Sequence, residues 1–178
     1  VAAVREGDNG YIYIDGNPTP AASGSSAARD LSASIGMAIG RDIRDNSRTF
    51  NGLIDEVKFH GIAKTGSEFE EDFNEYLTLS SPVAVGSWPF EEGSGTTTAD
   101  ASGNGYDGTI SGASWTMGRV GQGLNFSDNE VTLGAVPLGS SFTLAAWIKP
   151  NRVNGLKTQS IVARDGSFNF KLLGDGLR

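Results

Sequence analysis

Short strand-forming runs recur about every ten residues along much of this chain, and glycine, asparagine or aspartate separates them. This spacing is typical of antiparallel sandwiches and barrels, in which tight turns join consecutive strands. Glycine contributes 25 of the 178 residues, about double its usual share of ~7%. The sequence therefore predicts an all-β, two-sheet antiparallel sandwich with one short helix. Strands are expected at 1–4, 11–15, 34–40, 52–59, 83–90, 107–111, 113–117, 122–126, 129–133, 141–149, 159–164 and 168–173, and loops at 17–30 and 41–49.

The strand expected at 52–59 carries two neighbouring acids. Val57 and Phe59 lie on one face of a pleated strand, whereas the adjacent Asp55 and Glu56 point to opposite faces. One of these carboxylates is therefore expected to face whatever packs on the strand. An inward carboxylate must be hydrogen-bonded, paired with a cation or bound to a metal.

One helix is predicted, at 65–77. Thr65 and Glu68 fit a capping box, and Phe69 and Phe73 begin an apolar stripe. We expect this helix to lie on the sandwich and not to form a core of its own. An internal boundary follows it, in the linker near 78–82.

The part of the chain after this boundary resembles the beginning of a laminin-G-like, concanavalin A-like jelly-roll domain. The matching segments are Gly86-Ser-Trp-Pro-Phe-Glu-Glu-Gly-Ser-Gly95, Asp100-Ala-Ser-Gly-Asn-Gly-Tyr-Asp-Gly108, Gly118-Arg-Val-Gly-Gln-Gly-Leu-Asn-Phe126 and Phe142-Thr-Leu-Ala-Ala-Trp-Ile-Lys-Pro150. The part before the boundary resembles the end of such a domain. Its matching segments are Val1-Ala-Ala-Val-Arg5, Ile12-Tyr-Ile-Asp-Gly16 and Phe50-Asn-Gly-Leu-Ile-Asp-Glu-Val-Lys-Phe59.

The two parts stand in the reverse of the family's order. Either the chain is a slice across two tandem repeats, or it is a circular permutant of one domain. We expect residues 1–178 to form one composite β-sandwich domain, with a C-terminal half-repeat at 1–80 and an N-terminal half-repeat at 81–178. Roughly 20 residues, one or two strands, are expected to be missing between Arg178 and Val1. Neither half should be stable alone, so the halves should pack within one chain or by exchange between two chains, and an open sheet edge could also form a dimer.

The sharpest candidate site is the loop 100–108. Asp100, Ser102 and Asn104 occupy positions 1, 3 and 5 of a calcium-loop pattern, with Gly105 at position 6. The closing acid at position 12 is absent, so further ligands would come from Asp107, Glu91 or Asp55. The resemblance implies a structural Ca²⁺ ion, because many jelly-roll modules of this type carry one. The alternatives are an Asx-rich turn at 100–107 and, for Asp55, a buried carboxylate that caps loop amides.

Aromatic side chains are candidates for stacking on sugar rings. Trp88 and Trp147 lie in apolar strands and are expected in the core. The candidates for a surface platform are Tyr11, Tyr13, Tyr106 and Trp115, with ordinary half-buried packing as the alternative. The arginine-rich and aspartate-rich loop at 41–48 could be a second polar site, or a solvated loop whose ion pairs stabilise little.

The sequence gives little support for catalysis. It contains no cysteine, and its single histidine, His60, is expected to be structural. No nucleophile elbow is present, and the strand at 52–59 lacks the paired carboxylates with which glucanases of this fold act. A fold that is shared with enzymes is not evidence of catalysis.

Charge and hydropathy exclude further classes. The net charge of −7 disfavours nucleic-acid binding, which needs a basic face. No apolar run is long enough to insert into a membrane. The chain lacks an initiator methionine and a signal peptide, so we expect a piece of something longer.

These observations predict a secreted or cell-surface module of bacterial type. We expect a non-catalytic lectin-like domain that binds carbohydrate or mediates cell adhesion, stabilised by calcium, within a larger multidomain protein. Its partner would be a glycan or an extracellular protein. The alternatives are a structural spacer or protein-interaction repeat without a sugar site and, less strongly, a fragment of a glycoside hydrolase.

Overall fold

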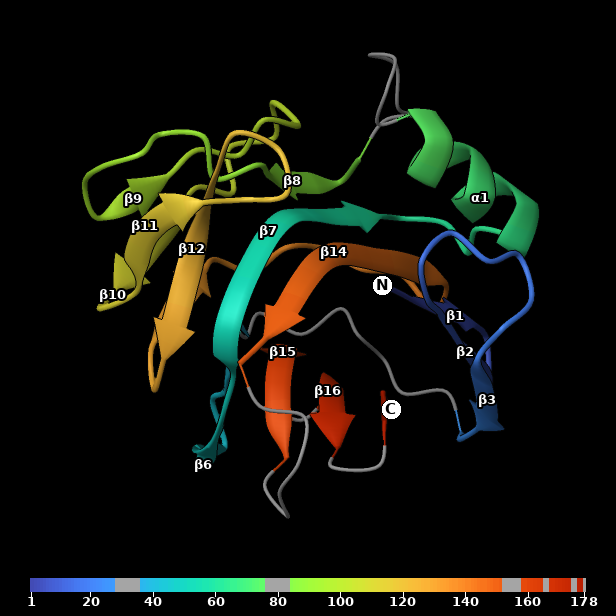
Figure 1. The fold of residues 1–178 in the computed structure, drawn as a ribbon. Helices are drawn as coiled ribbons and strands as arrows, with labels where there is room; N and C mark the ends of the chain where they lie inside the picture. Colours follow the sequence, from blue (N-terminus) through green and yellow to red (C-terminus); the bar gives the residue numbers. More distant parts are fainter. Residues whose placement is uncertain (28–35, 76–83, 152–157, 165–166, 174–175, 178) are drawn as a thin grey trace.

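A computed structural model describes residues 1–27, 36–75, 84–151, 158–164, 167–173 and 176–177. Two large antiparallel sheets pack face to face, and one helix lies outside them (Figure 1). The all-β sandwich predicted from the sequence is confirmed. Cross-strand pairing, and not the helix, therefore provides most of the regular structure.

The first sheet, here called sheet A, has eight strands. Its strand order is β11-β12-β7-β14-β1-β2-β3, and β8 also pairs with β7. The strands are β1 (Ala2–Glu6), β2 (Asn9–Tyr13), β3 (Ala22–Ser25), β7 (Asn51–His60), β8 (Gly86–Trp88), β11 (Ser114–Met117), β12 (Gln122–Ser127) and β14 (Phe142–Pro150). The long strand β7 therefore lies between two strands from much later in the chain.

The second sheet, sheet B, has the order β17-β16-β15-β4-β13-β10-β9. Its strands are β4 (Met37–Ile39), β9 (Thr97–Thr98), β10 (Gly108–Ser111), β13 (Glu130–Leu133), β15 (Gln159–Arg164), β16 (Phe168–Leu173) and β17 (Gly176–Leu177), and β5 (Arg41–Asp42) with β6 (Asp45–Thr49) forms a separate hairpin. Both large sheets thus combine strands from before and after the predicted linker. The linker near 78–82 lies outside the described residues, and the origin of the chain from two half-repeats stays a prediction.

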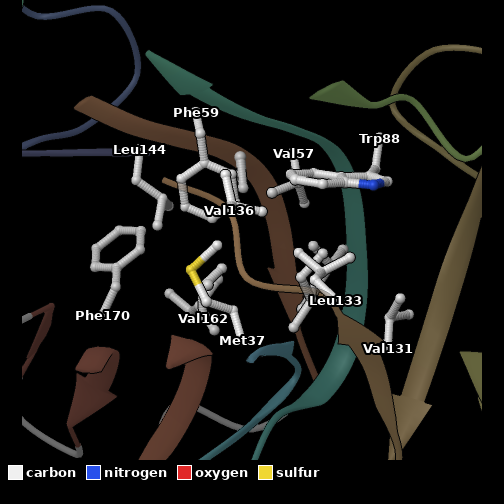
Figure 2. Packing of buried hydrophobic residues seen from close by; sticks show 14 of the residues in the cluster. Met37, Val57, Phe59, Trp88, Val131, Leu133, Val136, Leu144, Val162 and Phe170 are labelled. Carbon is white, nitrogen blue, oxygen red and sulfur yellow. The ribbon is translucent and has the colours of Figure 1, made fainter. Parts of the chain in front are cut away.

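The core lies between the sheets. Phe59 of β7 meets Trp88 of β8 edge to face, with ring centroids 5.4 Å apart, and side chains of sheet B such as Met37 and Val162 face them (Figure 2). All four side chains are fully buried. Replacing a buried Phe by Ala removes this packing and typically destabilises a domain by about 3–5 kcal/mol.

The helix α1 (Gly66–Glu75) covers part of the outer face of sheet A. Its capping box is confirmed, because the Glu68 carboxylate accepts a hydrogen bond from Thr65 N (2.8 Å) and Thr65 Oγ1 accepts one from Glu68 N (3.3 Å). Phe69 packs against a small cluster on β1 and β2 that includes Tyr13. The residues predicted as the last helical turn, 76–77, lie outside the described part of the chain.

The strand β7 is irregular where its two acids stand. Glu56 adopts a positive φ of 52°, and the pairing of β7 with β14 shifts between Ala145 and Trp147. Asp55 is paired opposite Trp147, and opposed residues of an antiparallel pair share a face. Asp55 therefore lies on the outer face of sheet A, away from the core.

Candidate functional site

Asp55 holds a tight turn against the outer face of sheet A. Its Oδ2 atom accepts hydrogen bonds from the backbone N–H groups of Arg119 (2.6 Å) and Val120 (3.1 Å). The turn must approach closely, since a Cβ on Gly118 would lie 2.4 Å from the same Oδ2 atom. Asp55 is 0% exposed. The sequence-based alternative for Asp55, a carboxylate that caps loop amides, describes these contacts.

The environment of Asp55 disfavours its ionised form. Burial raises the pKa of Asp55 to about 6, although the two N–H groups oppose this shift. Its second oxygen, Oδ1, is buried and has no hydrogen-bond partner among the described residues. The hold on the turn therefore depends on a carboxyl group that can take up a proton under mildly acidic conditions.

A groove of about 510 Å³ lies beside this turn, on the outer face of sheet A. One cross-strand row runs along it, because Ser114 pairs with Asn125, Asn125 with Leu53, and Leu53 with Lys149. Trp147 and Arg119 also line the groove. It therefore combines an aromatic ring, an aliphatic side chain, an amide and two cations.

Trp147 lies between the helix and the turn. Its ring centroid is 5.1 Å from that of Phe73 in α1, and the guanidinium carbon of Arg119 lies 4.9 Å from the indole centroid. The indole is half-buried. The prediction that Trp147 belongs to the core is wrong, because Trp147 shares its face of β14 with Thr143 and Lys149, whereas the core side chains of β14 stand at the alternate positions.

The four aromatic residues predicted as a sugar platform do not form one surface. Tyr13 is 6% exposed and packs 5.8 Å from Phe69, so this prediction is wrong for Tyr13. Tyr11 packs against the same cluster beside the helix, whereas Tyr106 and Trp115 pack against the main core. Of the four, only Trp115 borders the groove.

The carboxylate predicted as the first calcium ligand is already saturated by protein donors. Asp100 Oδ1 accepts hydrogen bonds from Ser87 N and Ser102 N, and Oδ2 accepts them from Ser102 Oγ and Tyr106 N, all at 2.8–3.1 Å. A carboxylate offers about four acceptor positions in total. Burial opposes ionisation, but these hydrogen bonds outweigh it and lower the pKa of Asp100 below its usual range.

The other predicted ligands are also engaged. Asp107 Oδ1 accepts from Asp100 N (2.9 Å), and Asn104 Nδ2 donates to the carbonyl of Val85 (3.0 Å). Glu91 Oε2 accepts from Gln122 N (3.1 Å), on the turn that Asp55 holds. Within the described ranges, no three His, Cys, Asp or Glu side chains gather as a metal site. The residues as placed do not fit a calcium ion, and the contacts are those of the Asx-rich turn.

The predicted polar loop at 41–48 forms the hairpin of β5 and β6. Asp42 is fully buried there and accepts hydrogen bonds from Arg44 N (3.0 Å) and from Asn169 Nδ2 of β16 (2.7 Å). The alternative of a solvated loop is therefore wrong for Asp42, which fastens the hairpin to sheet B. His60, expected to be structural, is 2% exposed.

Comparison with known families supports this architecture. Residues 1–69 match the family model described as the concanavalin A-like lectin/glucanases superfamily. No significant match was found among curated proteins or among solved structures. None of the described helical residues forms a segment long and apolar enough to cross a membrane. Residues 1–69, which supply β1 to β7 and the start of α1, thus resemble a laminin-G-like segment of the concanavalin A-like superfamily, and they pack into the two-sheet sandwich that this resemblance implies.

Proposed function

We propose that this domain is a non-catalytic carbohydrate-binding module whose ligand lies in the groove beside Trp147. The concanavalin A-like superfamily supports a carbohydrate-binding or adhesion-type role at a general level. The observation that carries the proposal is the half-buried indole of Trp147 on the wall of a groove that amides and cations also line.

The composition of the groove suits a sugar. Sugar rings pack on the faces of aromatic side chains, which offer a broad apolar surface. The side chains of Asn125 and Asn151 line the same groove, and each amide can both donate to and accept from hydroxyl groups. The volume of about 510 Å³ falls within the range of ~300–1,000 Å³ that is usual for small-ligand sites.

We propose a non-catalytic role because no pair of carboxyl groups lines the described part of the groove. Glycoside hydrolysis uses two carboxyl groups, about 5–10 Å apart, on either side of the scissile bond. No Asp or Glu is among the described residues that line the groove. Asp55 and Glu91, the nearby acids, both accept hydrogen bonds from the backbone of the turn.

A protein ligand is the second candidate. Met117 and Val120 are 80% and 42% exposed, and Met117 borders the groove. Exposed apolar side chains at a groove are common in protein-interaction surfaces. A location outside the cell, within a multidomain protein, is part of our proposal for either ligand.

A glycan array of neutral and acidic oligosaccharides tests the proposal. We expect binding that Trp147→Ala and Asn125→Ala both weaken at least tenfold, while Asn9→Ala, an exposed asparagine on β2, leaves it unchanged. Circular dichroism of each variant checks that the fold is retained, and Trp147→Phe provides a milder replacement if the alanine variant unfolds. Binding that is unaffected by both groove variants, or no binding across the array, would refute the proposal.

A further inference from the structure

The groove is cationic on a protein that is acidic as a whole. Arg119 and Lys149 line it, and both are exposed. Its described lining contains no Asp or Glu, although the chain has a net charge of −7. Neither cation forms an ion pair with any residue that the structure describes. Two positive charges that no described carboxylate neutralises thus line the site.

The fold fixes where these charges lie relative to Trp147. Lys149 follows Trp147 by two residues on β14, so both side chains lie on the outer face, with their Cα atoms roughly 7 Å apart. Arg119 reaches Trp147 from the turn that Asp55 holds, and its guanidinium carbon lies 4.9 Å from the indole centroid. Asp55 holds the backbone of Arg119 at 2.6 Å. The cations are therefore placed by the sheet and by a fixed turn.

On this basis, and resting on the proposed function, we propose that the ligand is an acidic glycan whose uronate carboxylates pair with Arg119 and Lys149 beside Trp147. A guanidinium binds a carboxylate through two parallel hydrogen bonds, and an ammonium binds it as a point charge. The protein as a whole carries a net charge of −7. It would repel a densely sulfated chain more strongly than a chain with one carboxylate per sugar ring, which favours the uronate.

Arg119 has a second role in this scheme. In the free protein its guanidinium occupies the space over the indole of Trp147, where a sugar ring would otherwise stack. An incoming carboxylate pairs with the guanidinium and offers it an alternative partner. A neutral sugar has no such group and must compete with Arg119 for the ring. The arginine therefore favours acidic over neutral ligands by attraction and by exclusion.

The experiment compares matched ligands. An array carries oligogalacturonate, oligomannuronate and glucuronate-containing oligosaccharides, each beside its methyl-esterified form, with neutral and sulfated oligosaccharides and poly-glutamate. The best uronate ligand and its ester are then titrated calorimetrically at low and high salt. We expect the ester to bind at least tenfold more weakly, and the affinity for the acid to fall as salt rises, because exposed charges are screened.

Three variants locate the charges. Arg119→Gln and Lys149→Gln should each weaken uronate binding about three- to tenfold. Arg119→Gln should also reduce the difference in affinity between the uronate and its methyl ester. Lys171→Gln makes the same change in net charge on β16 of sheet B and should have no effect. Equal binding of acid and ester, preference for a sulfated chain, or equal binding of poly-glutamate would each overturn this inference and not the groove itself. Failure of every glycan would overturn the proposed function as well.

Discussion

The carboxylate of Asp55 accepts a hydrogen bond of 2.6 Å from the backbone N–H of Arg119, a residue 64 positions later in the chain. This contact joins the longest strand of sheet A to the turn before β12. It also sets the point from which the Arg119 side chain reaches the indole of Trp147. The stability of the domain and the shape of the groove are therefore expected to change together when this contact is altered.

Asp55→Ala should lower the free energy of unfolding by about 3 kcal/mol. The substitution leaves the N–H groups of Arg119 and Val120 without their acceptor, and an unsatisfied buried donor costs about 1–3 kcal/mol. Urea unfolding followed by tryptophan fluorescence measures the change. Glu71→Ala, at an exposed position of α1, is the control and should shift the midpoint little. A loss no larger than that of the control would show that Asp55 does not hold the turn.

The stability of the wild type relative to Asp55→Asn should decrease as the pH rises from about 4 to about 6. The pKa of Asp55 is raised to about 6 in the folded protein, first by burial, and is about 3.9 in an unfolded chain. The folded state therefore binds the proton more tightly than the unfolded state. The stability that this proton contributes is fully present below the pKa of the unfolded chain, and it is lost as the pH rises through the pKa of the folded protein. One titrating group gives at most about 1.4 kcal/mol per pH unit. Unfolding curves at several pH values test this, and a difference that rises with pH would contradict the environment described for Asp55.

Asp100→Ala should lower the melting temperature equally in calcium and in excess chelator. The side chain accepts four hydrogen bonds from three residues, and their loss does not depend on a metal. Several degrees are expected, since about 1 kcal/mol corresponds to roughly 2–4 °C in a domain of this size. A metal that binds only the folded state would instead stabilise the wild type by mass action. A loss confined to the calcium sample would restore the metal site.

Gly118→Ala should weaken both the fold and the groove. A Cβ at this position would lie 2.2 Å from the carbonyl oxygen of Gln122 and 2.4 Å from Asp55 Oδ2, so the turn must move. Arg119 would move with it. Gly134→Ala is a suitable control because a Cβ there meets nothing within 4 Å. The melting temperature and the glycan affinity of Gly118→Ala should both be lower than those of the wild type. Wild-type values for both would show that the turn can accommodate a Cβ at this position.

Much of the fold could be predicted from local patterns. Strands such as β12, β15 and β16 contain short apolar runs with glycine close by in the sequence, and their positions agree with the prediction. The strand β3 lies within the stretch 17–30, for which the sequence predicts a loop. Its residues Ala22–Ser25 are all exposed and pair with β2. Exposed alanine, serine and glycine give no periodic signal, so tertiary pairing alone decides their structure.

The candidate site was harder to predict, because its contacts join distant residues. Asp100, Ser102 and Asn104 have the spacing of a calcium loop, but Ser87 N, 13 residues earlier, is one of the donors that saturate Asp100. No local pattern reports that donor. Trp147 could have been found from parity, since it stands two residues from Lys149 on β14. The outer face of sheet A is itself partly apolar here, because α1 covers part of it. The apolar residues around Trp147 therefore do not distinguish the outer face of β14 from its core face.

The position of β7 and β4 within their sheets has a consequence for the order of folding during synthesis. Ala2 pairs with Ala145, Ile54 with Ile148, and Met37 with Arg164. The N-terminal strands leave the ribosome first, yet each of these partners is made roughly 100 residues later. Folds dominated by such distant pairings form slowly and expose apolar surface in the meantime. A nascent chain that ends before Gln159 is expected to hold β4 without its partner β15, so the core should close only after β15 has been made.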